Sequence, residues 1–234
     1  MRYFSMKRLI LKFGGTSVGT IDKIKKVAKI IKKRFKAGNE IIVIVSAMSG
    51  TTDNLKKKSN LISKNFDSKE LDVLLSSGEQ VSCSLLSAAL INIGVKARSW
   101  LGWQIPIITN ENYNSSQITK IKTDEVIDFI SKKGVAVIAG FQGVSKENRI
   151  TTLGRGGSDL SAVAVAKFFN THSCEIYTDV DGVLTTDPSI NKKAKKIEKI
   201  SYEEMLEMAS LGAKVMQPGA VQASMIGNIP IHVR

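Results

Sequence analysis

The sequence predicts an α/β fold, a three-layer αβα sandwich around a mostly parallel central sheet. Runs that are apolar on both faces, such as "IIVIVS" at residues 41–46, alternate with segments of helical periodicity. This alternation is typical of a parallel sheet covered by helices on both sides. The 234 residues are 43% hydrophobic and contain neither a repeat nor a long linker. That length suits one large domain with its own core, so we expect a single domain over residues 1–234.

Short apolar runs locate the expected strands. The first run leads into a glycine-rich turn, and the second is continuously apolar until it ends at a serine. Continuous apolar character over five or six residues is typical of a strand that is buried on both faces. In chain order, the expected strands cover residues 9–13, 41–46, 97–101, 135–141, 174–180 and 229–234.

Helical spacing and glycine stops locate the expected helices. Apolar residues recur every three or four positions in residues 20–37, and Gly38 closes that helix. Gly134 ends another helix in the same way, after residues 124–133. The remaining helices are expected at residues 53–64, 79–93, 159–169, 202–211 and 219–225.

The net charge of +13, from 34 Lys and Arg residues against 21 Asp and Glu residues, raises the question of a nucleic-acid partner. Lysines are densest in residues 23–36, where they interleave with apolar residues at helical spacing and greatly outnumber arginines. We interpret this run as the solvated face of an amphipathic helix. We therefore expect no nucleic-acid partner.

Other classes of protein are excluded by what the sequence lacks. No apolar stretch approaches the length that spans a membrane, and "MRYFSMKR" lacks the apolar segment of a secretory signal. We expect no membrane partner and a cytoplasmic location. Cys83 and Cys174 lie far apart in apolar segments, which indicates buried small side chains. Neither they nor the two histidines show metal-ligand spacing, so we expect no metal site held by the protein.

Ligands of parallel α/β sheets lie beyond the carboxyl ends of the strands, so the loops that follow the strands are the candidate site. Lys12 stands near the end of the first strand, just before Gly14 and Gly15 in "KFGGTSVG". It could be a lysine that reaches solvent beside a tight turn. It could equally be part of a phosphate cradle built from backbone N–H groups, a helix N-terminus and one full charge. The order of lysine and glycines differs from that of the common P-loop.

Two further loops offer polar groups. "SAMSGTTDNL", residues 46–55, either caps a helix or presents hydroxyl donors to an anion. In "SSGEQ" we expect Glu79 at the start of an apolar helix. There it either complements the helix dipole or meets a cationic group in a cleft.

The run "TTLGRGGSDLSAVAVA" is the most informative. Arg155 lies between glycines, and Ser158 and Asp159 open an apolar helix. Either of these two residues could be an N-cap after a flexible loop. The arginine could instead form an anion site whose planar fork suits a carboxylate, with Asp159 orienting cations around a transferring group.

Acidic residues gather in "YTDVDGVLTTDP", residues 177–188. Turn chemistry explains Asp179, Asp181 and Asp187 one by one, and binding of the polar edges of a nucleotide explains them together. Lys214, in the later "LGAKVMQPGA", is expected at a helix end, where a cation is favourable in any case.

Six motifs, in this order, resemble the catalytic domain of aspartate kinases within the amino-acid-kinase superfamily: KFGGTSVG, SAMSGTTD, SSGEQ, TTLGRGGSD, IYTDVDGVLTTDP and GAKV. The resemblance runs from Lys7 to the last residue. SAMSGTTD, SSGEQ and LGRGGSD are more particular to aspartate kinases than the first and fifth motifs. The resemblance implies ATP-dependent phosphorylation of the side-chain carboxylate of L-aspartate to 4-phospho-L-aspartate, the first step toward lysine, threonine and methionine.

The resemblance also implies roles for individual residues. Lys12 would contact the transferring phosphate, and Asp159 would hold the catalytic lysines in place. Arg155 would grip the α-carboxylate of aspartate, and Glu79 its ammonium group. The other residues implied around aspartate are Ser46, Thr52, Phe141, Gly156, Gly157 and Ser158. Those implied around ATP are Lys12, Phe13, Gly14, Gly15, Thr178, Asp179, Leu184, Asp187, Lys214 and Val215. ATP is expected with Mg²⁺ that phosphates and water hold.

The same resemblance bears on organisation. It implies that the N-terminal part binds mainly aspartate and the C-terminal part mainly ATP, and it allows a homodimer. Because the motifs occupy the whole length, we expect no regulatory ACT domain within residues 1–234. Three positions depart from the usual pattern: Leu184 replaces an aromatic residue, Ser189 an arginine, and Met216–Gln217 a Leu-His pair.

Two alternatives remain. One is another small-acid kinase of the superfamily, such as acetylglutamate kinase, whose acylated substrate would leave Glu79 without an ammonium partner. The other is a non-catalytic protein that senses a nucleotide or an acidic ligand. A sensor would not need both Lys12 and Asp159.

Overall fold

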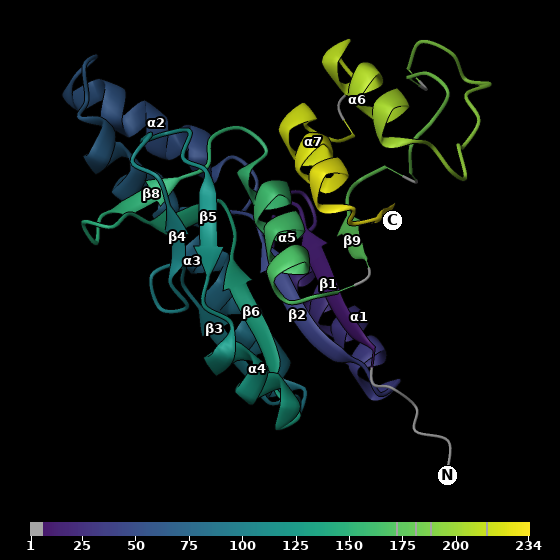
Figure 1. The fold of residues 1–234 in the computed structure, drawn as a ribbon, viewed down its shortest axis with the longest axis horizontal. Coiled ribbons are helices and arrows are strands. Elements are labelled where there is room, and N and C mark those ends of the chain that lie inside the picture. The colour runs from purple at the N-terminus through teal and green to yellow at the C-terminus, as the bar shows by residue number, and fades with distance from the viewer. Residues whose placement is uncertain (1–6, 172, 181, 188, 214) are drawn as a thin grey trace.

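A six-stranded parallel sheet forms the centre of the molecule (Figure 1). The computed structural model describes residues 7–171, 173–180, 182–187, 189–213 and 215–234. The strands of this sheet, in spatial order, are β10 (Ile231–Val233), β9 (Cys174–Tyr177), β1 (Arg8–Phe13), β2 (Glu40–Val45), β6 (Val135–Ala139) and β3 (Ala97–Trp100). Each pairing between them is parallel.

Helices cover both faces of this sheet. They are α1 (Ile21–Lys36), α3 (Ser68–Asn92), α4 (Asp124–Ser131), α5 (Gly157–Phe168), α6 (Tyr202–Ser210) and α7 (Pro218–Gly227). A further helix, α2 (Thr51–Ile62), packs on α3 instead. Side chains of α1 and α3 close one buried cluster against the sheet. Side chains of α4, α5, α6 and α7 close the other. The predicted three-layer α/β fold is therefore confirmed.

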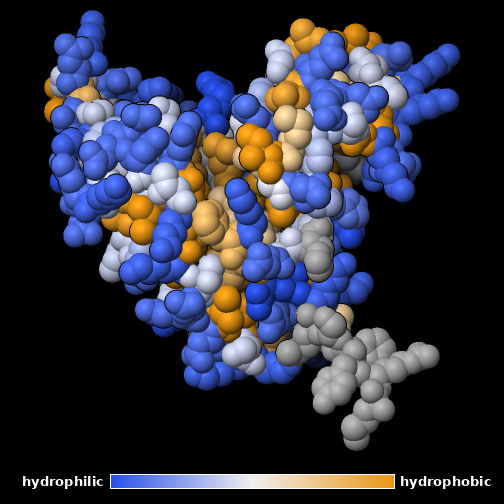
Figure 2. Space-filling model, in the orientation of Figure 1, coloured by the Kyte–Doolittle hydropathy of each residue, from blue (hydrophilic) through white to orange (hydrophobic). Residues whose placement is uncertain are grey.

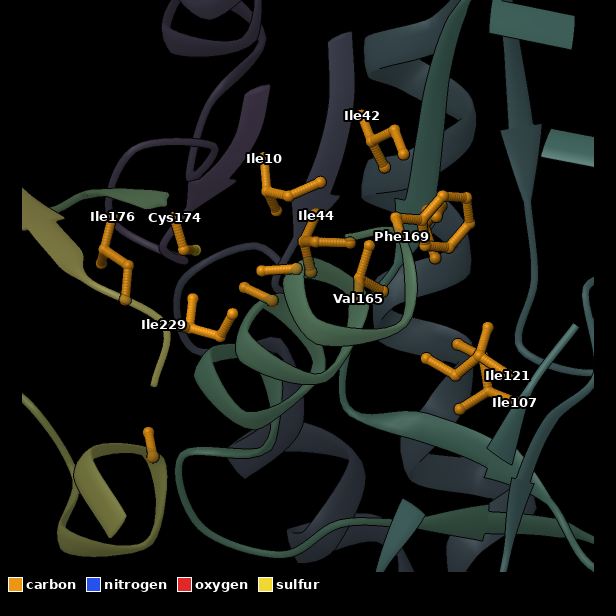
Figure 3. Packing of buried hydrophobic residues seen from close by; sticks show 14 of the residues in the cluster. Ile10, Ile42, Ile44, Ile107, Ile121, Val165, Phe169, Cys174, Ile176 and Ile229 are labelled. Carbon is orange, nitrogen blue, oxygen red and sulfur yellow. The ribbon is translucent and has the colours of Figure 1, made fainter. Parts of the chain in front are cut away.

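The alternation of side chains along β1 determines which way Lys12 points. Leu9, Leu11 and Phe13 pack into the cluster beneath α1 and α3. Ile10 packs into the cluster beneath α5, beside the residues drawn in Figure 3. Lys12 has the same parity as Ile10, so it faces the α5 side of the sheet.

Burial confirms the amphipathic helix that the lysine-rich segment predicts. Ile24, Val27, Ala28 and Ile31 of α1 are buried, while the lysines between them lie on the outside. Both cysteines are buried and free, as predicted. On the face drawn in Figure 2, hydrophilic residues cover most of the surface, and hydrophobic residues gather in the hollow between its two sides.

A second, smaller sheet was not predicted. It contains β5 (Ile118–Ile121), β4 (Ile107–Thr109), β7 (Gln142–Val144) and β8 (Ile150–Thr152) in that order, with antiparallel outer pairings and a parallel central one. Each strand has only three or four residues, too few to show a readable alternation. The sheet lies beside α3 and continues directly from β6 through Gly140 and Phe141.

The helix that carries Glu79 begins eleven residues earlier than predicted. The side chain of Asp67 caps α3 by accepting hydrogen bonds from the backbone N–H groups of Lys69 and Glu70, at 2.9 and 3.1 Å. Glu79 therefore lies in the middle of α3. The expectation that it complements a helix dipole is wrong, because that effect is confined to the first turn.

The length of α3 also revises the expectation about apolar stretches. By length and composition this one helix could cross a membrane, but half of its most apolar window is buried inside the domain. It packs against α1, β3, β6 and β8. Such burial is typical of the core helix of a globular domain.

Candidate active site

The carboxyl ends of β1 and β2, the turn after β6 and the first turns of α2 and α5 surround a cavity of about 260 Å³. Every residue that the resemblance assigns to catalysis or to aspartate lines this cavity, together with Ala47 and Gly154. The lining residues are Lys12, Ser46, Ala47, Thr52, Glu79, Phe141, Gly154, Arg155, Gly156, Gly157, Ser158 and Asp159. Segments far apart in the sequence thus converge on one small space.

A buried ion pair joins β1 to α5 at this cavity. The Nζ atom of Lys12 lies 2.6 Å from Oδ1 of Asp159, and the two residues are only 8% and 9% exposed. Charges buried to this degree need a partner, because transfer from water is costly. The pair therefore fixes the Lys12 ammonium group at the cavity wall.

The turn after β1 packs directly on the turn after β2. A Cβ atom on Gly15 would lie 2.8 Å from the carbonyl oxygen of Ala47, so only glycine allows this close approach. The N–H group of Gly14 donates to the carbonyl oxygen of Tyr177 at 3.2 Å, whereas that of Gly15 has no partner among the described residues. Of these two amides, the Gly15 N–H is the one free to bind a ligand.

Glu79 brings a buried carboxyl group to the cavity. It is 3% exposed, and its Oε1 atom accepts a hydrogen bond from the Ala47 N–H at 3.0 Å. Its Oε2 atom is buried without a partner among the described residues. Burial raises the pKa of this carboxyl group to about 7, and the Ala47 hydrogen bond opposes that rise only in part. A buried carboxylate oxygen with a free lone pair is a site for a cationic donor.

Arg155 is the cationic counterpart of Glu79. It is exposed on the loop between β8 and α5, and its guanidinium group makes no hydrogen bond or ion pair with the described residues. The N-terminus of α5 lies beside it, and that of α2 also meets the cavity. Both helices start at a glycine N-cap without a side-chain hydrogen bond. The first amides, of Thr51 and Gly157, donate to the carbonyl oxygens of Met48 and Gly154 at 3.0 Å. The next amides, of Thr52 and Ser158, have no partner among the described residues and remain available to an anion.

Among the described residues, four charged side chains line the cavity, and two of them are paired with each other. Lys12 and Asp159 neutralise each other within their ion pair. Arg155 and Glu79 remain, one cation and one anion, both without a charged partner among the described residues. This pair of opposite charges is complementary to a ligand that carries both a carboxylate and an ammonium group.

Phe141 lines the cavity in a strained conformation. Its φ angle is 68°, in the left-handed region that bulky side chains rarely adopt. Its N–H donates to Ser161 Oγ at 2.9 Å, and its carbonyl oxygen accepts from the Leu153 N–H at 2.9 Å. Strain of this kind persists only where the surroundings hold it, and it is frequent at functional sites.

The residues that the resemblance implies around ATP are more widely spread than those that it implies around aspartate. The Phe13 ring is buried and stacks on Tyr177, with ring centroids 4.6 Å apart, so it belongs to the core. β9 ends at Tyr177, three residues earlier than predicted, which leaves Thr178 and Asp179 on the loop. Thr178 Oγ1 donates to Asp179 Oδ1 at 3.1 Å.

Farther along this loop, residues 183–185 pair with residues 195–197, and local bonds form in the stretch between these two segments. Asp187 Oδ1 accepts hydrogen bonds from both the N–H and the hydroxyl of Ser189, at 2.8 and 2.6 Å, as in an Asx-turn. Leu184 forms an isolated bridge with Lys196, and Val215 is half-buried. Asp181 and Lys214 lie outside the described residues. Of the residues implied around ATP, Lys12 is the one described residue that lines the 260 Å³ cavity.

A larger groove of about 460 Å³ lies between β10 and the segment that leads into α6. Its charged lining residues, among them Lys196, Glu198 and Lys199, are exposed. None of these three is held in a buried position as Lys12 and Glu79 are. Within the described part of the chain, no group of three or more His, Cys, Asp and Glu side chains could hold a metal ion. The smaller cavity is therefore the candidate active site.

Sequence reasoning missed Ala47 and Gly154. Ala47 contributes its backbone N–H to Glu79, a role that no side-chain pattern reveals. Gly154 has a φ angle of 75°, and its place between Leu153 and Arg155 in "LGRGG" is a signal for such a conformation.

Known proteins resemble this chain over nearly its whole length. The sequence profile of the amino acid kinase family matches residues 7–234. An aspartate kinase of Pseudomonas putida is 46% identical over 228 residues, 97% of this chain and 56% of that protein. The crystal structure of aspartate kinase from Synechocystis superposes with a TM-score of 0.87 at 46% identity, covering 97% of this chain and 37% of that one.

A second solved structure is E. coli aspartokinase III in complex with aspartate and ADP. It superposes with a TM-score of 0.86 at 26% identity, over 97% of this chain and 61% of that one. This chain thus spans between 37% and 61% of the length of these three relatives.

Proposed function

The chain belongs to the amino acid kinase family, and from that premise we propose that it transfers the γ-phosphoryl group of ATP to the side-chain carboxylate of L-aspartate. The products are ADP and 4-phospho-L-aspartate. The observation that carries the proposal is the unpaired Arg155 and Glu79 on one cavity with the Lys12–Asp159 ion pair. The E. coli relative, solved with aspartate and ADP, supports this choice of substrates.

Arg155 and Glu79 recognise the two groups that all α-amino acids share. The guanidinium fork binds the α-carboxylate through two parallel hydrogen bonds. The free Oε2 atom of Glu79 accepts a hydrogen bond from the ammonium group. With both ends held, the side-chain carboxylate is directed toward Lys12. Thr52, Ser158 and the Phe141 ring limit the space around the ligand.

The acceptor carboxylate needs no general base, because it is ionised near neutral pH. One of its oxygens forms a bond to the γ-phosphorus as the bond from that phosphorus to the β,γ-bridging oxygen breaks, and ADP leaves with the electron pair. Negative charge on the transferring group is offset by the Lys12 ammonium, the Gly15 N–H and the N-terminus of α5. Asp159 keeps Lys12 in place through the 2.6 Å ion pair. ATP enters as its Mg²⁺ complex, with the metal on phosphates and water.

On the nucleotide side, the proposal gives roles to the loop that follows β9. Thr178, Asp179, Leu184, Asp187 and Val215 would surround ATP, with Lys214 completing the set. β9 pairs with β1, so this loop begins next to the turn that carries Gly14 and Gly15. We also propose that the protein is located in the cytoplasm and that it forms a homodimer. Light scattering on the purified chain would measure its oligomeric state.

The direct test is an assay of ADP release over a panel of acceptors, namely L-aspartate, L-glutamate, N-acetyl-L-glutamate and UMP, with trapping of any acyl phosphate by hydroxylamine. We expect ADP and the trapped product with aspartate alone. Turnover with N-acetyl-L-glutamate and not with aspartate would assign another small-acid kinase. Binding of aspartate and ATP without turnover would instead favour a sensing protein.

A further inference from the structure

The buried side of α3 carries a line of polar residues behind the candidate site. Asp72, Ser76, Glu79 and Ser82 recur at the three- and four-residue spacing that places side chains on one helix face, and all are buried. Ser82 Oγ donates to the carbonyl oxygen of Ser46 at 2.6 Å, and Glu79 binds the next residue along that loop. This face of α3 therefore holds the loop after β2.

Asp72 is the charged member of this line that does not line the cavity. It is 0% exposed, and it has no ion pair with a described residue. Its Oδ2 atom accepts from the Thr152 N–H at 2.8 Å, and its Oδ1 atom from the Thr152 hydroxyl at 2.5 Å. Both oxygens accept from the Asn114 N–H at 3.1 Å. One buried carboxyl group thus binds three donors on two other segments.

These donors hold the start of the Arg155 loop. Thr152 is the last residue of β8, and its carbonyl oxygen accepts from the Ser116 N–H at 2.9 Å. Gly154, at a φ angle of 75°, lies so near the carbonyl oxygen of Asn114 that a Cβ atom would approach it to 2.8 Å. The segment around Asn114 is therefore held against Thr152, three residues before Arg155, and against Gly154, the residue directly before it.

We propose that Asp72 is a positioning residue, which sets the place of Arg155 by anchoring Thr152 and Asn114 to α3. The Arg155 guanidinium has no partner of its own among the described residues, so its position depends on this backbone anchor. The kinetic part of the proposal rests on the proposed aspartate kinase function. The structural part does not.

Two substitutions of Asp72 separate its hydrogen bonds from its charge. Asp72→Ala leaves three buried donors without an acceptor. In Asp72→Asn the amide oxygen still accepts from the two N–H groups, while the NH₂ group donates to a reoriented Thr152 hydroxyl. Because the anchor consists of hydrogen bonds, we expect the asparagine variant to retain it.

Glu70 offers a matched control on the same helix and against the same strand pair. Its carboxylate contacts Arg149 at 2.6 Å, just before β8, but on the surface, with side-chain exposures of 57% and 36%. Exposed ion pairs contribute little. Glu70→Gln therefore removes the charge of an ion pair between α3 and this hairpin without touching the anchor of Arg155.

The experiment compares steady-state kinetics and backbone hydrogen exchange for the wild type, Asp72→Ala, Asp72→Asn and Glu70→Gln. We expect Asp72→Ala to raise the KM for aspartate about tenfold or more, because a small misplacement of a substrate-binding group is costly. The KM for ATP stays within about twofold, and amides of residues 152–157 exchange faster. Asp72→Asn and Glu70→Gln stay close to the wild type in both readouts.

Unchanged aspartate KM and unchanged exchange in Asp72→Ala would overturn the proposal, and so would equal effects of Glu70→Gln. If Asp72→Ala does not fold, Thr152→Val tests the same anchor, since this substitution deletes only the hydroxyl donor to Asp72. It should raise the aspartate KM by roughly threefold, the loss of about one hydrogen bond, and an unchanged value would contradict the anchor. If the wild type does not phosphorylate aspartate at all, the proposed function fails, and hydrogen exchange alone still tests the anchor.

Discussion

The two sides of the candidate site are built in opposite ways. On the aspartate side, Lys12, Glu79 and Asp159 are buried and held by partners distant in the sequence. On the nucleotide side, Asp179 and Asp187 are exposed, and they accept hydrogen bonds from Thr178 and Ser189, one and two residues away along the chain. The aspartate cavity is thus preorganised before a ligand arrives, whereas the acidic side chains of the nucleotide loop lie in solvent and bond to near neighbours in the sequence.

This difference has an energetic consequence. A buried carboxylate or cation without a partner costs free energy in the empty protein, and a ligand of matching charge offsets that cost when it binds. Exposed loop residues have no such cost to offset. Substitutions in the cavity should therefore change kinetics strongly and for one substrate, and substitutions in the loop should change them weakly.

The largest effect is expected for Lys12→Ala. The substitution removes the charge that offsets the transferring phosphoryl group, so kcat should fall by about 10²–10³. It also leaves Asp159 without its ion-pair partner, so circular dichroism should accompany the assay to verify the fold. Near-normal turnover in a folded variant would show that Lys12 does not serve the reaction.

Arg155→Lys should raise the KM for aspartate by about tenfold or more, since a charged two-point hydrogen bond becomes a single contact. The charge itself is retained. Because Arg155 lines the cavity and has no other partner among the described residues, the KM for ATP should change much less. Steady-state kinetics with each substrate varied in turn would measure both values, and equal changes would contradict the role.

The pH dependence of aspartate binding should report Glu79. Its pKa is raised to about 7 by burial, and only the ionised form attracts the ammonium group. The KM for aspartate should therefore rise by up to about tenfold for each pH unit below 7, and level off above it. Glu79→Gln should lose this dependence and keep a high KM throughout.

The same raised pKa of Glu79 affects the stability of the empty protein. Here a higher pH is unfavourable, whereas it favours the binding of aspartate. The folded state holds the Glu79 proton more tightly than the unfolded chain does, so the free energy of unfolding without ligand should fall as pH rises from about 4.5 to about 7. Urea denaturation of the wild type and of Glu79→Gln across this window measures that difference. A wild-type stability that rises relative to the variant would contradict the assignment.

The smallest effect is expected on the nucleotide side. Leu184→Tyr places a ring where the resemblance leads one to expect an aromatic residue, and stacking on the base should lower the KM for ATP by about twofold to tenfold. The KM for aspartate should stay unchanged, because Leu184 does not line the cavity. A larger change for aspartate than for ATP would remove the distinction between the two sides.

Much of this arrangement could be predicted from the sequence, because continuous apolar runs mark β1, β2 and β6 and the glycine-rich loops mark their carboxyl ends. The second sheet could not, since its strands are too short to show periodicity. The start of α3 was misplaced because Gly78 resembles a helix break. Asp67 with Glu70 three residues later is the capping signal that would have found it.

Within the site, the sequence could predict which residues take part, but not how deeply they are buried or which of their atoms lack a partner. The motifs point to Lys12, Glu79 and Arg155, but neither the depth of Glu79 nor its free Oε2 atom follows from its neighbours in sequence. The role of Asp72 was missed for the same reason. A carboxyl group inside an apolar helix segment shows its function only when the donors that it binds, from residues 114 and 152, are seen beside it.

The most direct test of the account changes the ligand and the protein together. Succinate is aspartate without its ammonium group, so the ratio of kcat/KM for aspartate over succinate measures what that group contributes. We expect the wild type to prefer aspartate by on the order of 10²-fold or more, as for a buried charge left unpaired. In Glu79→Gln the preference should shrink to within about tenfold, because the partner of the ammonium group is gone. A preference that persists undiminished in Glu79→Gln would contradict the claim that this cavity recognises an amino acid through Glu79.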